Sequence, residues 1–520
     1  MQAALDRPVI IWKTFAWAFA AAAVFALTCR YPGYVHHDTA EIAMWSRLGW
    51  PLGLPKHPPL LPWLFRIYSY ALPLNWVTLS LLTAANIVLG AWAVWRIALL
   101  SVGAKRAAVA LMLYGLAPAG TFFALKLNHN AILVSLWPLT ILAFLQCLRA
   151  QTVGRSAAMG VVFGALAAAA MLAKYYSGVL LACCFVASLV SADRNRFYKL
   201  PGAYLAVATF LLLVAPHVWW MWENRGATLD YALHESEREA HPLLHFLTVT
   251  PMYLVPMVAA FIAMKRWLWK SSDDAAKAAT VRQYPELCVL AVGPFVLTAA
   301  FILAFKLRGA TSWSLPDFCV VPVLLAAILP QFGEDTMLRL KRAAAMALTI
   351  VAAAGPVVGF TAFALGDNNA TEPRVEFAQA AGRIFAAGTR HEPNIVAGDP
   401  QSTNAAALDI GSKPAAFTNF NSAFAPWVTP QKLDSEGLLV ICRPSYGGCR
   451  EQTAAFVAQH ARASGFVCSL SMQRWWLWKA GRLNSAEVTV LMPKGTNVDE
   501  SNAKIACATG GPSASFVRLF

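Results

Sequence analysis

Charged side chains are scarce in this sequence. They make up 13% of its 520 residues, whereas 58% of the residues are hydrophobic. A soluble globule of this size needs more polar side chains to cover its surface. The composition therefore argues against an ordinary soluble protein and indicates a protein that buries apolar surface in lipid.

Several common catalytic motifs are missing as well. The sequence contains no zinc-ligand spacing, no phosphate-binding loop, no dinucleotide fingerprint and no Gly-x-Ser-x-Gly elbow. A soluble nucleotide-sugar donor therefore has no recognisable binding motif. The net charge of +15 calls for no nucleic-acid partner, because most of the basic residues have a topological explanation.

Long apolar runs fill the first 365 positions of the chain. We find about eleven runs of roughly 17 to 25 residues, the length that spans a hydrocarbon core. The first run is too long for a cleaved signal peptide and leads into further runs. They lie near residues 10–29, 75–95, 107–125, 131–148, 157–173, 176–192, 201–221, 246–264, 286–305, 314–330 and 343–365.

Basic residues collect in alternate loops, such as Lys105 with Arg106 and the segment 194–199. Such loops stay in the cytoplasm. The N-terminus is then cytoplasmic, and the loops 30–74 and 222–245 and the tail lie outside the cell inner (cytoplasmic) membrane. The sequence thus predicts an α-helical polytopic membrane protein, with a multi-span domain over 1–365 and a periplasmic, extracytoplasmic α/β domain over 366–520.

Cysteine usage provides a separate indication of this topology. Six of the ten cysteines lie in apolar runs, and the other four lie in the predicted outer tail. Disulfides persist outside the cytoplasm. Of the three possible pairings we favour Cys442 with Cys449 and Cys468 with Cys507. Four reduced core cysteines are the alternative.

A carboxylate follows the first apolar run, in the segment His36-His37-Asp38-Thr39-Ala40-Glu41. An acid close to the lipid interface is placed to receive a proton from an acceptor hydroxyl during sugar transfer. Asp38 with Glu41 three residues later is also a capping box that starts a helix. Asp38 and Glu41 could form part of a divalent-metal site, although no full ligand set is visible.

Cations also occur where membrane topology disfavours them. Lys56 and His57 precede a Pro-Pro pair, and further cations lie at the outer ends of three spans. Cations that converge at one membrane face would bind the phosphate of a lipid carrier. A Pro-rich helix start and snorkelling anchors are the alternatives. The candidate phosphate-binding residues are Lys56, His57, Lys174, Lys306 and Arg308, with Lys126 at the same depth.

Amides and aromatic rings lie beside these cations, and both suit sugar hydroxyls. An ordinary interfacial belt would use the same residues. The candidate sugar- and acceptor-binding residues are His37, Asn128, Asn130, Tyr175 and Tyr176.

Together these segments resemble the GT-C glycosyltransferases, the class related to protein mannosyltransferases and bacterial lipid A aminoarabinose transferases. The resemblance covers about the first 330 residues. It rests on Asp38, the Lys56–Leu61 run, the Ala173–Gly178 stretch and the Ala215–Trp220 stretch. Two positions depart from the pattern: Thr39 follows Asp38 where a glutamate is common, and Asn128 or Asn130 replaces an aspartate.

The resemblance implies a polyprenyl-phosphate sugar donor, inversion at the anomeric carbon, and Asp38 as the base. The predicted function is transfer of a hexosyl or pentosyl group to lipid A, lipopolysaccharide core or another glycan, with secreted protein as the alternative acceptor. A transporter or flippase is a rival, although ionisable groups at mid-membrane are expected for one. An inactive scaffold is a third possibility.

Overall fold

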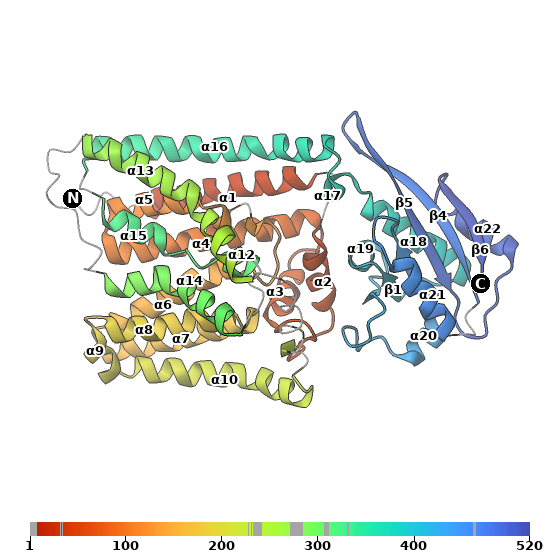
Figure 1. Ribbon diagram of the computed structural model, residues 1–520, viewed down its shortest axis with the longest axis horizontal. Coiled ribbons are helices and arrows are strands. Elements are labelled where there is room, and N and C mark those ends of the chain that lie inside the picture. Colours follow the sequence, from red (N-terminus) through yellow and green to blue (C-terminus); the bar gives the residue numbers. More distant parts are fainter. Residues whose placement is uncertain are drawn as a thin grey trace. The chain divides into compact units, whose positions relative to one another are not determined.

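The computed structural model describes residues 8–31, 33, 35–121, 123–226, 228–229, 231, 242–270, 284–305, 311–329, 332–460 and 464–520. The chain divides into two compact units (Figure 1). The first unit comprises Met1–Val24, Pro51–Leu61 and Leu81–Ala353. The second comprises Phe25–Trp50, Pro62–Ser80 and Ala354–Phe520.

The first unit is built from helices. Two long helices, α1 (Pro8–Arg30) and α16 (Glu334–Ala364), begin in this unit, and their last turns belong to the second. The others are α4 (Trp76–Val102), α5 (Ala104–Gly115), η2 (Pro118–Gly120), η3 (Phe123–Leu125), α6 (Leu133–Leu148), α7 (Val153–Ala173), α8 (Ser177–Val190), α9 (Arg194–Lys199), α10 (Gly202–Glu223), α12 (Pro242–Val249), η4 (Thr250–Leu254), α13 (Val255–Lys270), α14 (Pro285–Phe305), η7 (Thr311–Ser314) and α15 (Val321–Ala327).

The described residues contain seven helical segments that are long and apolar enough to cross a membrane. A multi-pass membrane protein is therefore confirmed. The runs 131–148 and 176–192 form shorter apolar helices, α6 and α8. The runs 107–125 and 314–330 contain only α5 and α15 as α-helices, so the predicted number of about eleven spans stays a prediction.

Glycines let α7 and α10 approach closely. A Cβ atom built on Gly160 would lie 2.2 Å from the carbonyl oxygen of Gly202, and one on Gly164 would lie 2.3 Å from that of Ala206. In lipid the hydrophobic effect contributes little to the association of helices. Small residues stabilise helix pairs there because they allow the two backbones to pack closely. The helices α7 and α10 are therefore a closely packed pair within the first unit.

The second unit contains a sheet covered by helices (Figure 1). Its described strands form one six-stranded sheet in the order β2-β1-β3-β5-β4-β6, parallel from β2 to β3 and antiparallel beyond. The elements are α2 (His37–Trp45), α3 (Leu60–Ser69, mostly in this unit), α17 (Asn368–Thr371), α18 (Arg374–Thr389), β1 (Ile395–Gly398), α19 (Pro400–Asp409), β2 (Ala415–Thr418), α20 (Pro430–Glu436), β3 (Leu438–Cys442), α21 (Cys449–Gln459), β4 (Gly465–Trp476), β5 (Lys479–Leu491), α22 (Glu500–Ala508) and β6 (Ala514–Leu519).

Local sequence explains the central elements of this sheet. The strands β1 and β3 are buried along their whole length, as continuous apolar runs between covered faces should be. Asp399 caps α19 by accepting hydrogen bonds from the amides of Gln401 and Ser402, with Pro400 at the first helical position. The predicted C-terminal α/β domain is therefore confirmed as a fold, and its predicted boundary at residue 366 stays a prediction.

Disulfides close two parts of this unit. Cys442 is bonded to Cys449, and Cys468 to Cys507, the pairs that the sequence favours. The first bond joins the end of β3 to the start of α21. The second joins β4 to α22, so that each bond fixes a helix to the sheet.

Phe25–Trp50, which contains the first part of the predicted outer loop 30–74, belongs to this same unit. Helix α2 packs on α19 and β2, and its side chains Ile42, Met44 and Trp45 are almost fully buried. The apolar spacing of residues 42–50 would also suit a helix that lies on the lipid interface, but in the structure protein covers the apolar face of α2. The prediction that Asp38 starts a capping box is wrong. His36 is the N-cap of α2, its Nδ1 accepts a hydrogen bond from the Asp38 amide, and Asp38 lies inside the first turn.

Candidate functional site

Lys174 is the centre of a group of side chains from three segments of the helical unit. Its ammonium donates a hydrogen bond to Oδ1 of Asn130 and lies 4.7 Å from the centre of the Trp313 ring. Nδ2 of Asn130 in turn donates to Oγ of Ser312 at 3.2 Å. The amide and the indole are both neutral groups, and these two contacts orient the ammonium.

Two histidines extend this group. His129 bonds through Nδ1 to the carbonyl of Ala173 at 3.0 Å, directly before Lys174. The ring of His57 lies against the His129 ring, with 4.1 Å between centroids. We call His57, His129, Asn130, Lys174, Ser312 and Trp313 the Lys174 cluster.

The segment that carries Lys56 and His57 is held by α10 and the residues after it. Nδ1 of His217 donates to the Leu52 carbonyl at 2.7 Å, and Thr228 donates to the Leu54 carbonyl at 2.6 Å. Gly53 lies against Trp220, where a Cβ atom would be 2.0 Å from the indole. These contacts fix the backbone of an irregular segment. They thereby hold the His57 ring against the His129 ring.

Tyr175 supports the same segment. Because the Leu52 carbonyl only accepts, Nδ1 of His217 carries a proton, and Nε2 of the neutral ring accepts from the Tyr175 hydroxyl at 2.7 Å. Burial raises the pKa of the Tyr175 hydroxyl to about 12, partly offset by a hydrogen bond with Thr228. The hydroxyl therefore stays protonated and acts as a donor.

Tyr176 points into the helix bundle. Its hydroxyl lies 2.8 and 2.9 Å from the two carboxyl oxygens of Asp317 and 2.8 Å from the Thr298 hydroxyl, and its ring stacks on Trp137. These contacts connect the start of α8 to the segment that carries Trp313. These contacts fix the Tyr176 side chain among the packed helices, two residues after Lys174.

The other predicted residues of this face fall into two classes. Oδ1 of Asn128 accepts from the backbone amides of Asn130 and Ala131, so its oxygen stabilises the turn before α6. Lys306 and Arg308 lie outside the described residues. The predicted convergence of those cations on Lys174 stays a prediction.

Asp38 lies in the second unit, in the first turn of α2. Its carboxyl oxygens are 3.0 Å from Nδ1 of His37 and 3.6 Å from Nδ1 of His36, and about a third of its side chain is exposed. Within the described chain, His36, His37 and Asp38 form the group whose potential metal-ligand atoms all lie within 4.8 Å of one another. Glu41, one turn later, is not a member of this group.

The C-terminal domain holds the backbone around Asp38 from both sides. Nη2 of Arg474 on β4 donates to the Gly33 carbonyl at 2.8 Å, and Nη2 of Arg47 donates to the Ala407 carbonyl of α19 at 2.9 Å. Burial lowers the pKa of Arg47 to about 10 and lowers that of Arg474. Arg474 is buried and Arg47 is partly exposed, and both attach the segment Phe25–Trp50 to the C-terminal domain.

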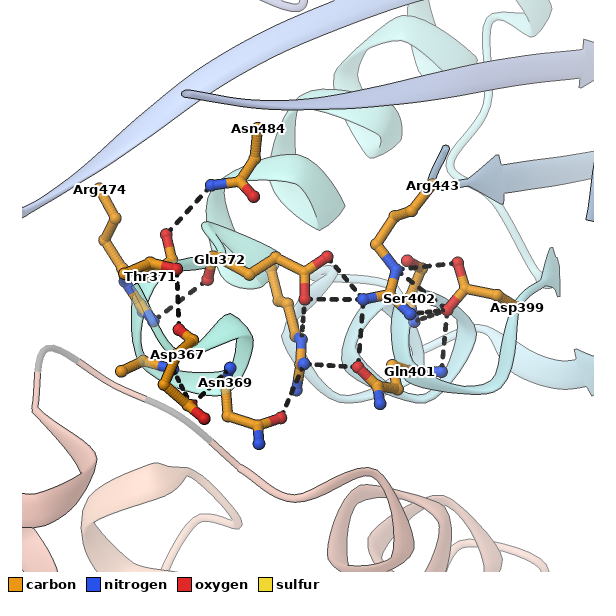
Figure 2. Close-up of polar contacts among 12 residues, drawn as sticks. Asp367, Asn369, Thr371, Glu372, Asp399, Gln401, Ser402, Arg443, Arg474 and Asn484 are labelled. Atoms are coloured by element: carbon orange, nitrogen blue, oxygen red, sulfur yellow. Dashed lines mark hydrogen bonds and ion pairs between the residues drawn. The ribbon is translucent and has the colours of Figure 1, made fainter. Parts of the chain in front are cut away.

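A buried ion network underlies these contacts (Figure 2). Arg443 donates to Asp399 through Nε and Nη2, the latter at 2.6 Å, and to Glu372 through Nη1 at 2.6 and 2.7 Å. Arg374 bonds to the same Glu372 at 2.8 Å. Burial alone would lower the pKa of Arg443, but the two carboxylates more than offset this and raise it. The network fixes the start of α19, on which α2 rests.

Residues 56–220 match the family of dolichyl-phosphate-mannose-protein mannosyltransferases. The crystal structure of ArnT from Cupriavidus metallidurans in the apo state superposes with a TM-score of 0.60 at 15% identity, covering 93% of this chain and 98% of that one. ArnT from the same organism bound to undecaprenyl phosphate gives a TM-score of 0.60 at 16% identity, with 92% and 97% covered. No curated protein matches the chain by sequence.

The chain is related to the GT-C glycosyltransferases. At these identities the likeness to ArnT establishes the fold. The segment that matches the mannosyltransferase family contains His57, Asn130, Lys174 and Tyr175. Most of the Lys174 cluster therefore lies in the part of the chain that carries the GT-C relation.

Sequence reasoning placed His129 beside Asn130 on this face but missed Ser312 and Trp313 as members of the Lys174 cluster. Ser312 and Asn130 are 182 residues apart in the sequence, and only the packed helices bring them together. One signal was available, because Trp313 lies in a short polar segment, Thr311–Ser314, beside apolar runs. Irregular backbone between membrane-spanning helices is tolerated where protein buries it or where it lines a water-filled cavity.

Proposed function

We propose that this protein is an inverting glycosyltransferase that moves a monosaccharide from a polyprenyl-phosphate donor to a cell-envelope acceptor at the outer face of the cytoplasmic membrane. The observation that carries the proposal is the Lys174 ammonium, oriented by Asn130 and Trp313. The mannosyltransferase family match over 56–220 and the fold of ArnT support it.

The Lys174 cluster suits the phosphate of a lipid carrier. A rigidly held ammonium binds a phosphate through charge-assisted hydrogen bonds, and His57 adds a second group that donates when protonated. An ArnT structure that contains undecaprenyl phosphate makes this class of ligand the first to test. Lys56, next to His57, is proposed to contact the same phosphate.

The transfer step needs a base and a stabilised leaving group. Asp38 takes the proton of an acceptor hydroxyl while the hydroxyl oxygen bonds to the anomeric carbon. The bond from that carbon to the phosphate oxygen breaks, and the electron pair stays on the polyprenyl phosphate, where Lys174 stabilises the added negative charge. Attack from the face opposite the phosphate inverts the anomeric configuration.

The residues around Asp38 also fit a divalent metal ion. Two imidazole nitrogens and one carboxylate oxygen suit zinc and similar transition metals better than magnesium, which prefers oxygen ligands. His36, His37 and Asp38 would hold such an ion, which would lower the pKa of a bound hydroxyl. The proton transfer to Asp38 described above does not depend on it.

The acceptor is proposed to be lipid A, lipopolysaccharide core or another envelope glycan. Protein is the second candidate, because the matching family is described as transferring mannose to protein. Both acceptors offer a hydroxyl to Asp38. They are distinguished by where the added sugar is found.

Binding of undecaprenyl phosphate to the full-length protein in nanodiscs tests the donor site. Removing one charged partner of a phosphate costs about 1.5 to 3 kcal/mol, so Lys174→Gln should weaken binding about tenfold to a hundredfold. The control is Lys199→Gln at the end of α9, predicted to face the cytoplasm, which should bind as the native chain does. Equal loss in both variants, or none at Lys174→Gln, would contradict the proposal.

A further inference from the structure

The hairpin of β4 and β5 ends in a tip that presents large apolar side chains. Trp476 pairs with Lys479, so Leu477 and Trp478 form a two-residue turn. Trp475, Leu477 and Trp478 are 56%, 62% and 79% exposed. Single exposed apolar residues are common, but three within four positions at the end of one hairpin form a patch that indicates a binding surface.

The base of this tip is fixed to the last turns of two membrane-spanning helices in the same unit. The Trp476 ring lies 5.0 Å from the Tyr31 ring, directly after α1, and 6.2 and 5.9 Å from Phe360 and Phe363 in α16. Gly481 also lies against Phe363. The tip is therefore held at the level where α1 and α16 leave the membrane.

The turn itself uses residues that hairpins disfavour. Leu477 has a φ of 52°, the left-handed region in which a branched side chain is strained and in which Asn and Gly are preferred. Glycine at position 477 would adopt this φ without this cost. Strain kept at an exposed position suggests that the leucine and tryptophan serve a function other than folding.

The charges around the tip have one sign. Lys479 and Arg482 are exposed, and residues 473–486 contain no aspartate or glutamate. Tryptophan is enriched at membrane interfaces, and basic residues near a membrane surface are attracted to anionic headgroups. The tip thus combines apolar side chains with basic residues, as a segment inserted at a lipid surface should.

We propose that the tip formed by Trp475, Leu477, Trp478, Lys479 and Arg482 inserts into the membrane interface and anchors the C-terminal domain on phospholipid. Exposed apolar side chains continue to the end of α16, since Phe360 is 36% exposed and Leu365, directly after the helix, is 82% exposed. The apolar side chains enter the boundary of headgroups and acyl chains, and the two cations contact phosphate groups. The occupant is lipid, continuous with the lipid around α1 and α16.

Photocrosslinking from the tip tests this anchor. The full-length protein would carry benzoylphenylalanine at position 478, or at position 505 as the control, in nanodiscs of phosphatidylethanolamine and phosphatidylglycerol. Ile505 is similarly exposed, at 66%, on α22 of the same domain. After irradiation, mass spectrometry should find phospholipid adducts at position 478 at a yield several-fold above that at position 505. Equal yields, or adducts at 478 to a second copy of the protein, would overturn the proposal.

A second variant separates lipid contact from folding. Leu477→Gly combined with Trp478→Asn suits a two-residue turn in which the first residue has a positive φ, so hydrogen exchange of the β4 amides should stay slow. Benzoylphenylalanine at position 475 should then give fewer lipid adducts in this background than in the native one. An unchanged adduct yield with an intact β4 would contradict insertion through Leu477 and Trp478.

Discussion

Replacing Arg443 by methionine tests how the C-terminal domain supports the segment that carries Asp38. Arg443 lies between Asp399 and Glu372, and all three side chains are less than a tenth exposed (Figure 2). Methionine fills much of the same volume and removes the charge. It would leave two buried carboxylates without their shared partner.

The structure sets the expected cost. Breaking a buried ion pair costs about 3 to 5 kcal/mol, because the remaining charge is left uncompensated. Glu372 would keep its bond from Arg374, and Asp399 would keep the two amides at the start of α19. The loss in unfolding free energy should therefore lie near the lower end, at about 3 kcal/mol.

Thermal unfolding of the full chain in nanodiscs, with hydrogen exchange of α19 and α2, measures this loss. The matched control is Lys494→Ala, which breaks an exposed pair with Asp434 at 3.5 Å and should cost less than about 1 kcal/mol. Faster exchange in both helices and a lower midpoint are expected for Arg443→Met alone. An Arg443→Met protein that unfolds and exchanges like the control would refute the reasoning.

Two further changes test other parts of the account. Gly160→Val should push α7 away from the backbone of Gly202 and lower thermal stability and membrane yield, at a cost of about 1 to 3 kcal/mol. Gly154→Ala on the same helix places its methyl group in open space and should leave stability unchanged. A Gly160→Val protein as stable as the native chain would contradict the packing. Burial raises the pKa of Asp409 to about 6 from 3.8, so its contribution to stability is fully present below about pH 4 and is lost as the pH rises through 6. Asp409→Asn mimics the protonated form and should raise stability at pH 7.5 by roughly 1 to 3 kcal/mol but not at pH 4, as measured by thermal unfolding, while the exposed Asp434→Asn changes little at either pH; no gain at pH 7.5 would contradict the assignment.

Much of the fold follows from local patterns in the sequence. Apolar run length predicts the long helices because a backbone in lipid must satisfy its own hydrogen bonds. The run 107–125 misleads, since α5 ends at Gly115 and Ala117 is extended before Pro118. The sequence also does not predict that α2 is buried against α19, because an apolar helix face suits lipid and protein equally well.

The candidate site is only partly visible in the sequence. Asp38, His57 and Lys174 stand out because their charge is unusual beside apolar runs. Trp313 and Ser312 do not, since their contacts with Lys174 and Asn130 join distant segments. Neutral side chains that orient a cation add no charge to the sequence, so their role becomes visible only when the helices are packed together.

Glycan mass spectrometry of lipid A and core saccharide tests the central proposal most directly. Cells that lack this protein would be complemented with the native chain or with Asp38→Asn at matched membrane abundance. The proposal predicts a hexose, pentose or aminosugar mass that is lost without the protein and restored by the native chain but not by Asp38→Asn. Full restoration by Asp38→Asn would contradict the role of Asp38 as base, and glycans that never change would contradict these acceptors.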